Sequence, residues 1–338
     1  MNRLCICAVI GTGALIAYAQ AQDQSAKLAW TPPRAADGHA DISGSWANNI
    51  ATPLERPKEL ANRPFLTDQE TAALRKKARE LFNGQGDAAF GDTVFLTALA
   101  NVTGTKIGFK SVDGETGDYS SVWTVEREFE NRTSLITDPP DGRLPAMTPE
   151  GQKRRAANGF GINRPADKPE DRPLQERCIT YGTPSLTAGY QSGYQIVQTP
   201  GAVVIVTEMI HDARVIPLDA RPHLPSEIHQ WTGDSRGHWE GDTLVVETSN
   251  YKPRSFMSIS SDKLRVVERF TRADAETLKY EIAIDDPGTW TQPWSLMIPL
   301  RRSSDPLYEY ACHEGNYGMA GVLAGARAAE RAAAKPSK

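Results

Sequence analysis

Short segments in which apolar and polar residues alternate recur through the second half of the chain. They span residues 194–198, 202–210, 243–249, 264–271, 278–284 and 294–300. Because successive side chains of a strand point to opposite faces, each segment predicts a β-strand with one buried face. Turn residues separate the segments, and Thr199-Pro200-Gly201 predicts a hairpin. The regular spacing predicts a mainly β fold, an antiparallel meander that forms a barrel or a sandwich.

Helical signals flank this β-rich region. Thr67 and Glu70 form the pattern of a capping box, and Gly84 follows as a stop signal. We therefore expect a peripheral helix near residues 68–83, and the alanine-rich composition after Asn316 predicts a helical tail. Weaker patterns predict strands at 41–46, 121–127 and 132–137, a helix from Thr148-Pro149, a long loop at 158–176 and a polar turn at 233–237.

The N-terminus has the pattern of a secretory signal. A positive start at Met1-Asn2-Arg3 precedes an apolar run from Leu4 to Ala19, and Ala19-Gln20-Ala21 offers a small-residue cleavage site. The alternative is a membrane anchor, but the run is shorter than the roughly 20 apolar residues of a spanning helix. We expect a signal peptide at 1–21, a flexible arm at 22–40, a β-rich domain at 41–315 and a helical tail at 316–338. The mature protein is expected to be periplasmic or secreted and to have no membrane span.

Charge and cysteine content narrow the function classes. The net charge is −4 and no stripe of lysine or arginine is present, so nucleic-acid binding is not expected. Cys178 and Cys312 remain after signal cleavage, and in an oxidising compartment they predict a disulfide, with two free thiols as the alternative. No zinc-type spacing of cysteine or histidine occurs, so no metal site is predicted, and the sequence identifies no cofactor.

Strand alternation places carboxylates on faces that are otherwise apolar. Glu268 shares a face with Val266 and Phe270, and the same alternation puts Glu208 with Val204 and Val206, continuing to Arg214. A charged carboxylate is costly to bury unless it is paired. The pattern therefore predicts either a polar ligand pocket or a structural arginine–carboxylate pair. Between these we predict the pocket.

These residues give the candidate site. Glu208, Arg214, His223 and Trp290 are the predicted ligand-binding residues, and Glu268 and His211 are the candidate acid–base pair. The leading hypothesis is an exported protein that binds a small organic ligand. The alternatives are a periplasmic hydrolase or lyase that uses the Glu/His pair, and an interaction module without a pocket.

Several segments together resemble a family of exported bacterial proteins whose activity is not known. The segments are RTSLI at 132–136, DPPDGR at 138–143, EMIHD at 208–212, IPLD at 216–219, RPHLP at 221–225, GDSRG at 233–237, WEGDTLVV at 239–246 and YEYACHEGNY at 308–317. The resemblance covers most of the mature chain. It implies a bacterial exported protein and supplies no activity, so function has to be argued from the residues.

Overall fold

A computed structural model describes residues 30–82, 91–104, 125–158 and 166–334. The predicted signal peptide, residues 22–29 of the predicted arm, Gly84, residues 121–124 and residues 159–165 of the predicted loop lie outside the described residues. The chain divides into two units, Met1–Thr31 and Pro32–Lys338. All described helices and strands lie in the second unit.

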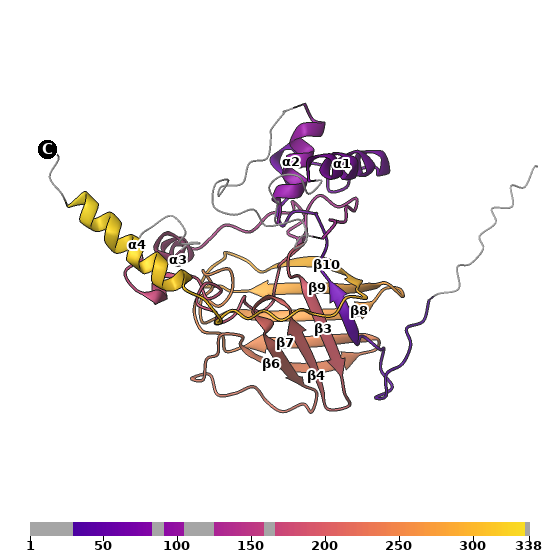
Figure 1. Ribbon diagram of the computed structural model, residues 1–338. Helices are drawn as coiled ribbons and strands as arrows, with labels where there is room; N and C mark the ends of the chain where they lie inside the picture. The colour runs from indigo at the N-terminus through magenta and orange to yellow at the C-terminus, as the bar shows by residue number, and fades with distance from the viewer. Residues whose placement is uncertain (1–29, 83–90, 105–124, 159–165, 335–338) are drawn as a thin grey trace, which may run out of the picture. The chain divides into compact units, whose positions relative to one another are not determined.

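The second unit is built around one antiparallel sheet (Figure 1). The strands are β1 Gly44–Ala47, β2 Ile136–Asp138, β3 Gly193–Gln198, β4 Ala202–Thr207, β5 Ala213–Pro217, β6 Asp234–Glu240, β7 Thr243–Ser249, β8 Arg265–Arg272, β9 Thr277–Asp285 and β10 Trp294–Arg302. They pair in the order β5-β4-β3-β1-β10-β9-β8-β7-β6, and β2 pairs with β10 outside this path. The mainly β prediction is confirmed.

The sheet curls into a nearly closed barrel. β5 and β6, the two ends of the strand order, lie next to each other. Gly237 of β6 lies close to the end of β5. A Cβ at this position would be 2.8 Å from side-chain carbons of both Ile216 and Leu218. The interior is filled by apolar side chains from the strands, among them the fully buried Trp46 and Trp294. The described strands therefore enclose one main core.

Four helices occur within the described residues: α1 Asp68–Leu81, α2 Thr93–Val102, α3 Pro149–Asn158 and α4 Gly318–Ala333. The predicted capping box is present at the start of α1, where the Glu70 amide donates to the Thr67 hydroxyl at 3.2 Å. Thr148 likewise accepts from the Gly151 amide at the start of α3. The sequence analysis did not identify α2, which packs with α1 around a second, smaller core that includes Leu74 and Phe95.

Two structural expectations were wrong in detail. β4 buries Val203 and Ile205, so Val204 and Val206 lie on the outer face, opposite to the predicted phase. The 3-10 turn Met209–His211 then interrupts the alternation before β5 begins. The predicted polar turn at 233–237 is largely strand, because β6 starts at Asp234 and the Ser235 hydroxyl is buried against Thr248 at 3.0 Å.

Residues of the predicted arm contact the barrel where the structure describes them. Arg34 pairs with Asp242, and the His39 ring stacks on Trp239 with ring centres 4.7 Å apart. Ala40 is fully buried. Residues 34–40 are therefore a folded edge of the domain and not a free arm.

Cys178 and Cys312 form the predicted disulfide, with their Cα atoms 5.6 Å apart. The bond joins the segment before β3 to the segment before α4. Within the residues that the structure describes, no helix has both the length and the apolar character to span a bilayer.

Replacing both disulfide cysteines by serine is expected to lower the free energy of unfolding by about 4–5 kcal/mol, because a cross-link over this separation restricts the unfolded chain. Urea unfolding of the double variant beside the oxidised wild type measures the difference. A difference below about 1 kcal/mol, or two reactive thiols per chain in denatured unreduced protein, would contradict the assignment.

Candidate functional site

A charged pair crosses the interior of the barrel. Glu268 on β8 is completely buried, and Arg214 on β5 donates to both of its carboxylate oxygens, with one contact at 2.9 Å from Nη2 to Oε1. The Tyr280 hydroxyl of β9 donates to the same Oε1 at 2.5 Å. The structure thus brings together two of the predicted site residues, in the arrangement of an arginine–carboxylate pair.

The surroundings of this pair are aromatic and shielded from water. Burial raises the pKa of Tyr194 to about 12, and its hydroxyl donates to the Ser185 carbonyl at 2.9 Å. Burial, reinforced by the negative charge of Glu268, also raises the pKa of Tyr280 well above its ordinary value. Burial alone would lower the pKa of Arg214, but the adjacent Glu268 carboxylate outweighs it, and the net direction is upward. Arg214 therefore stays charged.

The cavity at this pair is small. It is lined by Arg214, Tyr194, Phe270 and Tyr280 among others, and its volume is about 20 Å³. Such a volume is enough for about one water molecule. Together with the double contact from Arg214, this favours the structural alternative for Glu268 over the pocket that we predicted.

The remaining predicted residues do not join one cluster. Glu208 lies at the end of the β3–β4 pair, where its carboxylate accepts from the amides of Gly193 and Tyr308 at 3.1 and 3.4 Å. His211 is exposed at the surface of the 3-10 turn. Trp290, which we expected in a pocket, lies in the core at 2% exposure, because its ring packs edge-on against Phe256 and Trp294.

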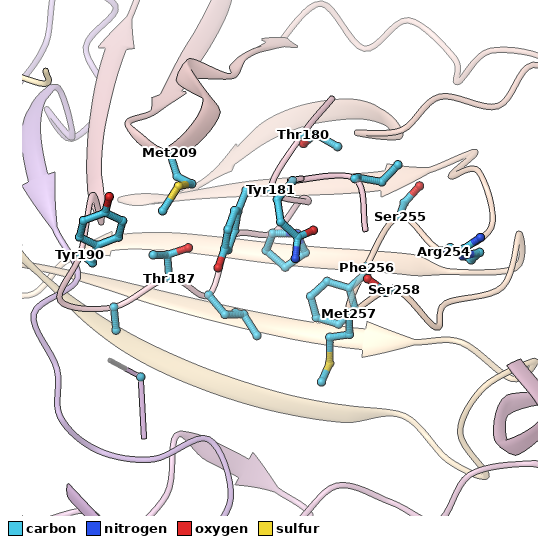
Figure 2. Close-up of a pocket in the computed structure, with 16 residues that line it drawn as sticks. Thr180, Tyr181, Thr187, Tyr190, Met209, Arg254, Ser255, Phe256, Met257 and Ser258 are labelled. Atoms are coloured by element: carbon cyan, nitrogen blue, oxygen red, sulfur yellow. The ribbon is translucent and has the colours of Figure 1, made fainter. Parts of the chain in front are cut away.

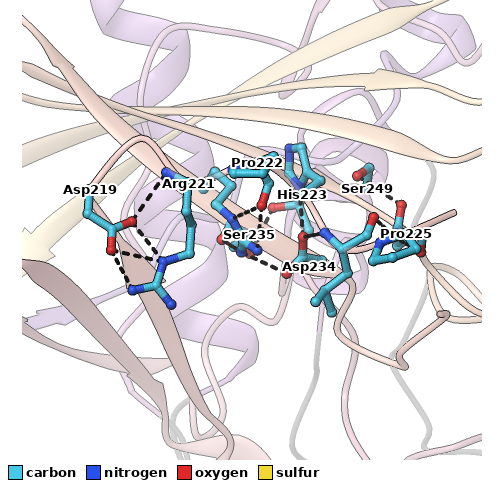
Figure 3. Close-up of polar contacts among 12 residues, drawn as sticks. Asp219, Arg221, Pro222, His223, Pro225, Asp234, Ser235 and Ser249 are labelled. Carbon is cyan, nitrogen blue, oxygen red and sulfur yellow. Dashed lines mark hydrogen bonds and ion pairs between the residues drawn. The ribbon is translucent and has the colours of Figure 1, made fainter.

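His223 has a partner that the sequence analysis did not identify (Figure 3). Its Nδ1 lies 2.8 Å from Asp234, whose carboxylate also accepts from the Leu224 amide and from Arg236. Burial would raise the pKa of Asp234, but these three donors outweigh it and hold the pKa below its ordinary value. An ionised Asp234 favours the tautomer with the proton on Nδ1, leaving Nε2 of His223 as an acceptor.

A larger cavity lies between two loops (Figure 2). Its volume is about 310 Å³, and we call it the loop pocket. The lining residues come mainly from segment 174–190, before β3, and from segment 254–258, between β7 and β8; they are Gly91, Leu174, Gln175, Thr180, Tyr181, Pro184, Leu186, Thr187, Ala188, Tyr190, Met209, Arg254, Ser255, Phe256, Met257 and Ser258. Rings, methionines and a few hydroxyl groups are typical of small-molecule pockets, and the volume is within their usual range.

The second wall of the loop pocket has an unusual backbone. Arg254, Met257 and Ser258 all have positive φ, at 71°, 49° and 58°. This conformation is uncommon for residues with a side chain, and each such residue costs on the order of 1–3 kcal/mol when the conformation is strained. Three of them in five consecutive positions require strong support from the surrounding structure.

That support comes from hydrogen bonds beneath the wall. The Ser260 hydroxyl accepts from the Phe256 amide at 3.0 Å, and Arg154 donates to the Ile259 carbonyl at 2.9 Å. The buried Asp286 accepts from both the amide and the hydroxyl of Ser261 at 2.8 and 2.5 Å. These hydrogen bonds hold the second wall of the loop pocket to the segments beneath it.

The first wall is held from the other side. The disulfide anchors it at Cys178, and the side-chain amide of Asn48 donates to the Thr187 carbonyl at 2.8 Å. Asp212 accepts from the Thr180 hydroxyl and the Tyr181 amide; burial raises the pKa of Asp212 in spite of these two donors. A neighbouring hollow of about 730 Å³, lined partly by Tyr190 and Cys312, is more open to solvent and therefore less suited to enclose a ligand.

Sequence periodicity could not identify the loop pocket, because its residues lie on loops. The His223–Asp234 contact was equally hidden, since it joins a loop to the first residue of a strand. Among the described residues, no group of three or more histidine, cysteine, aspartate or glutamate side chains is arranged to hold a metal ion.

Comparisons of the chain with family models, with curated proteins and with solved structures give no match.

Replacing Glu268 by glutamine is expected to lower the free energy of unfolding by about 3–5 kcal/mol, because Arg214 would remain buried without its counter-charge. Glu281→Gln is the matched control. Its carboxylate pairs with Lys279 at the surface, and the change should cost less than about 1 kcal/mol. Urea unfolding of both variants measures the effects. A Glu268→Gln protein as stable as the control would restore the pocket role for Glu268.

Proposed function

We propose that the mature chain is an exported protein that binds a small organic molecule in the loop pocket. The observation that carries this proposal is the pocket itself, a cavity of about 310 Å³ lined by rings and formed by braced loops. Conformationally strained residues occur preferentially at ligand sites, where the surrounding structure maintains them. Three of them line this cavity.

Export is supported by the signal-like N-terminus and by the disulfide. Cysteine pairs of this kind persist in oxidising compartments such as the periplasm or the extracellular medium. The bond also fits the proposed binding role, because Cys178 lies between two residues that line cavities, Arg177 and Thr180. It holds the first wall of the pocket in place.

Saturable binding of N-phenyl-1-naphthylamine, a neutral dye whose fluorescence rises in apolar surroundings, tests the proposal. We expect one site per chain, and Tyr181→Ala should weaken binding about tenfold, because a stacking ring is lost from the lining. Tyr308→Ala removes an exposed ring outside the pocket and should leave binding unchanged. Non-saturable binding, or equal effects of the two variants, would reject the loop pocket as the site.

One observation favours a second candidate function, a hydrolase or lyase. It is the His223–Asp234 pair, in which a carboxylate orients an imidazole as in general-base sites. Glu268 is a weaker candidate base than His223, because Arg214 already occupies both of its oxygens. His223 keeps 32% of its side chain exposed and can reach a bound molecule.

This second candidate is tested by hydrolysis of p-nitrophenyl butyrate. If His223 is the base, His223→Gln should lower the rate by about a hundredfold or more, the usual contribution of a positioned base. His238→Gln, which changes a half-exposed histidine beside Glu240, serves as the control. Equal rates in the two variants would leave binding as the function.

A further inference from the structure

We infer that the ligand of the loop pocket is an amphipathic anion: an apolar, ring-containing body that carries one carboxylate, sulfonate or phosphate group. The inference rests on the proposed function and names the ligand class for the same site. It follows from the distribution of charge at one end of the pocket.

A small cavity of about 20 Å³ adjoins the loop pocket and shares Leu174, Arg254 and Ser258 with it. Its other lining residues include Arg172, Arg177 and Trp231. The lining of the small cavity thus includes three arginines, of which Arg254 also lines the loop pocket. No aspartate or glutamate is among the described residues that line either cavity.

The three guanidinium groups differ in their hydrogen-bond and ion-pair partners. Arg172 is paired with Glu176 at 2.6 Å and is part of the structural frame. Arg254 donates to the backbone carbonyl of Glu170 at 3.1 Å, which fixes the direction of its side chain. The half-buried Arg177 uses its backbone amide to donate to the Pro173 carbonyl at 3.3 Å, while its guanidinium group makes no hydrogen bond or ion pair to another described residue.

A partly desolvated guanidinium without an anionic partner is unfavourable, and a ligand anion removes that cost. Arginine suits carboxylate, sulfonate and phosphate groups, because its donors form a planar fork. Because the small cavity has room for about one water molecule, the anionic group would lie at the Arg254 end of the loop pocket, where Arg254 can contact it and the vacant donors of Arg177 line the adjoining cavity.

The rest of the loop pocket defines the other half of the ligand. In Figure 2, Arg254 and Tyr190 lie at opposite ends of the lining, with Tyr181, Phe256 and Met257 between them. An anionic group at the Arg254 end would place the body of the ligand over these rings. The hydroxyl groups of Thr180 and Ser258 lie along the same lining and offer hydrogen bonds, but no charge.

The binding of two dyes that share one carbon skeleton tests this inference separately from the proposed function. N-phenyl-1-naphthylamine is neutral, and 8-anilino-1-naphthalenesulfonate is the same skeleton with a sulfonate. We expect the sulfonate to bind the full chain at least about tenfold more tightly than the neutral dye, because a charge-assisted contact is added. Added salt should reduce this preference.

Variants of Arg177 show where the preference arises. Arg177→Met should bring the affinity ratio of the two dyes close to one by weakening the binding of the sulfonate. Arg177→Lys should keep an intermediate ratio, and Arg265→Met, a change on the exposed face of β8, should keep the full ratio. A ratio near one in the wild type, or a ratio that Arg177→Met does not change, would overturn the inference and leave the proposed function standing. Failure of both dyes to bind at one site per chain would overturn both.

Discussion

The structure depends on the neutralisation of one charge in the interior of the barrel. Glu268 faces inward because strand alternation leaves it no other direction, and Arg214 reaches it from β5, a strand at the open end of the sheet order. Loss of either partner would leave an uncompensated charge in the interior, so the pair ties β5 to β8. This contact spans the barrel near the point where β5 and β6 approach without a hydrogen-bonded ladder among the described residues. Tyr280 completes the arrangement by donating to the same carboxylate.

The sequence predicted those parts of the fold that local rules control. β8 alternates as expected, and α1 begins at Thr67 because its capping box uses residues only three positions apart. The prediction failed where tertiary contacts determine the strand phase or the ends of a strand. The turn Met209–His211, with Ile210 at a φ of 64°, resets the phase between β4 and β5, and no periodic pattern encodes such a reset. Ser235 looked like a turn residue, yet its hydroxyl finds a buried partner across the β6–β7 pair.

The candidate site was harder to predict for the same reason. Strand phase correctly placed Glu268 inside, but it could not distinguish a pocket from an ion pair, because both bury a carboxylate. The loop pocket is formed by side chains whose neighbours in space lie far away in sequence. Its backbone is also unexpected, since Arg254, Met257 and Ser258 are not the glycine or asparagine that usually mark positive φ. Cys178 was the one signal in the sequence that pointed to this region, and it pointed to a covalent bond rather than to a cavity.

The position of β1 has a consequence for the way in which the chain folds. β3 to β5 and β6 to β10 are two meanders whose strands pair with their neighbours in sequence, and such local pairs form early. β1 lies between them, pairing Trp46 with Tyr194 on one side and with Arg302 on the other. Pairing β1 with β3 and β10 brings together residues from near the two ends of the domain, and closing so long a loop of chain has an entropic cost. The four residues of β1 therefore form the hydrogen-bonded junction between the two meanders, and this junction depends on contacts between residues that are far apart in the sequence.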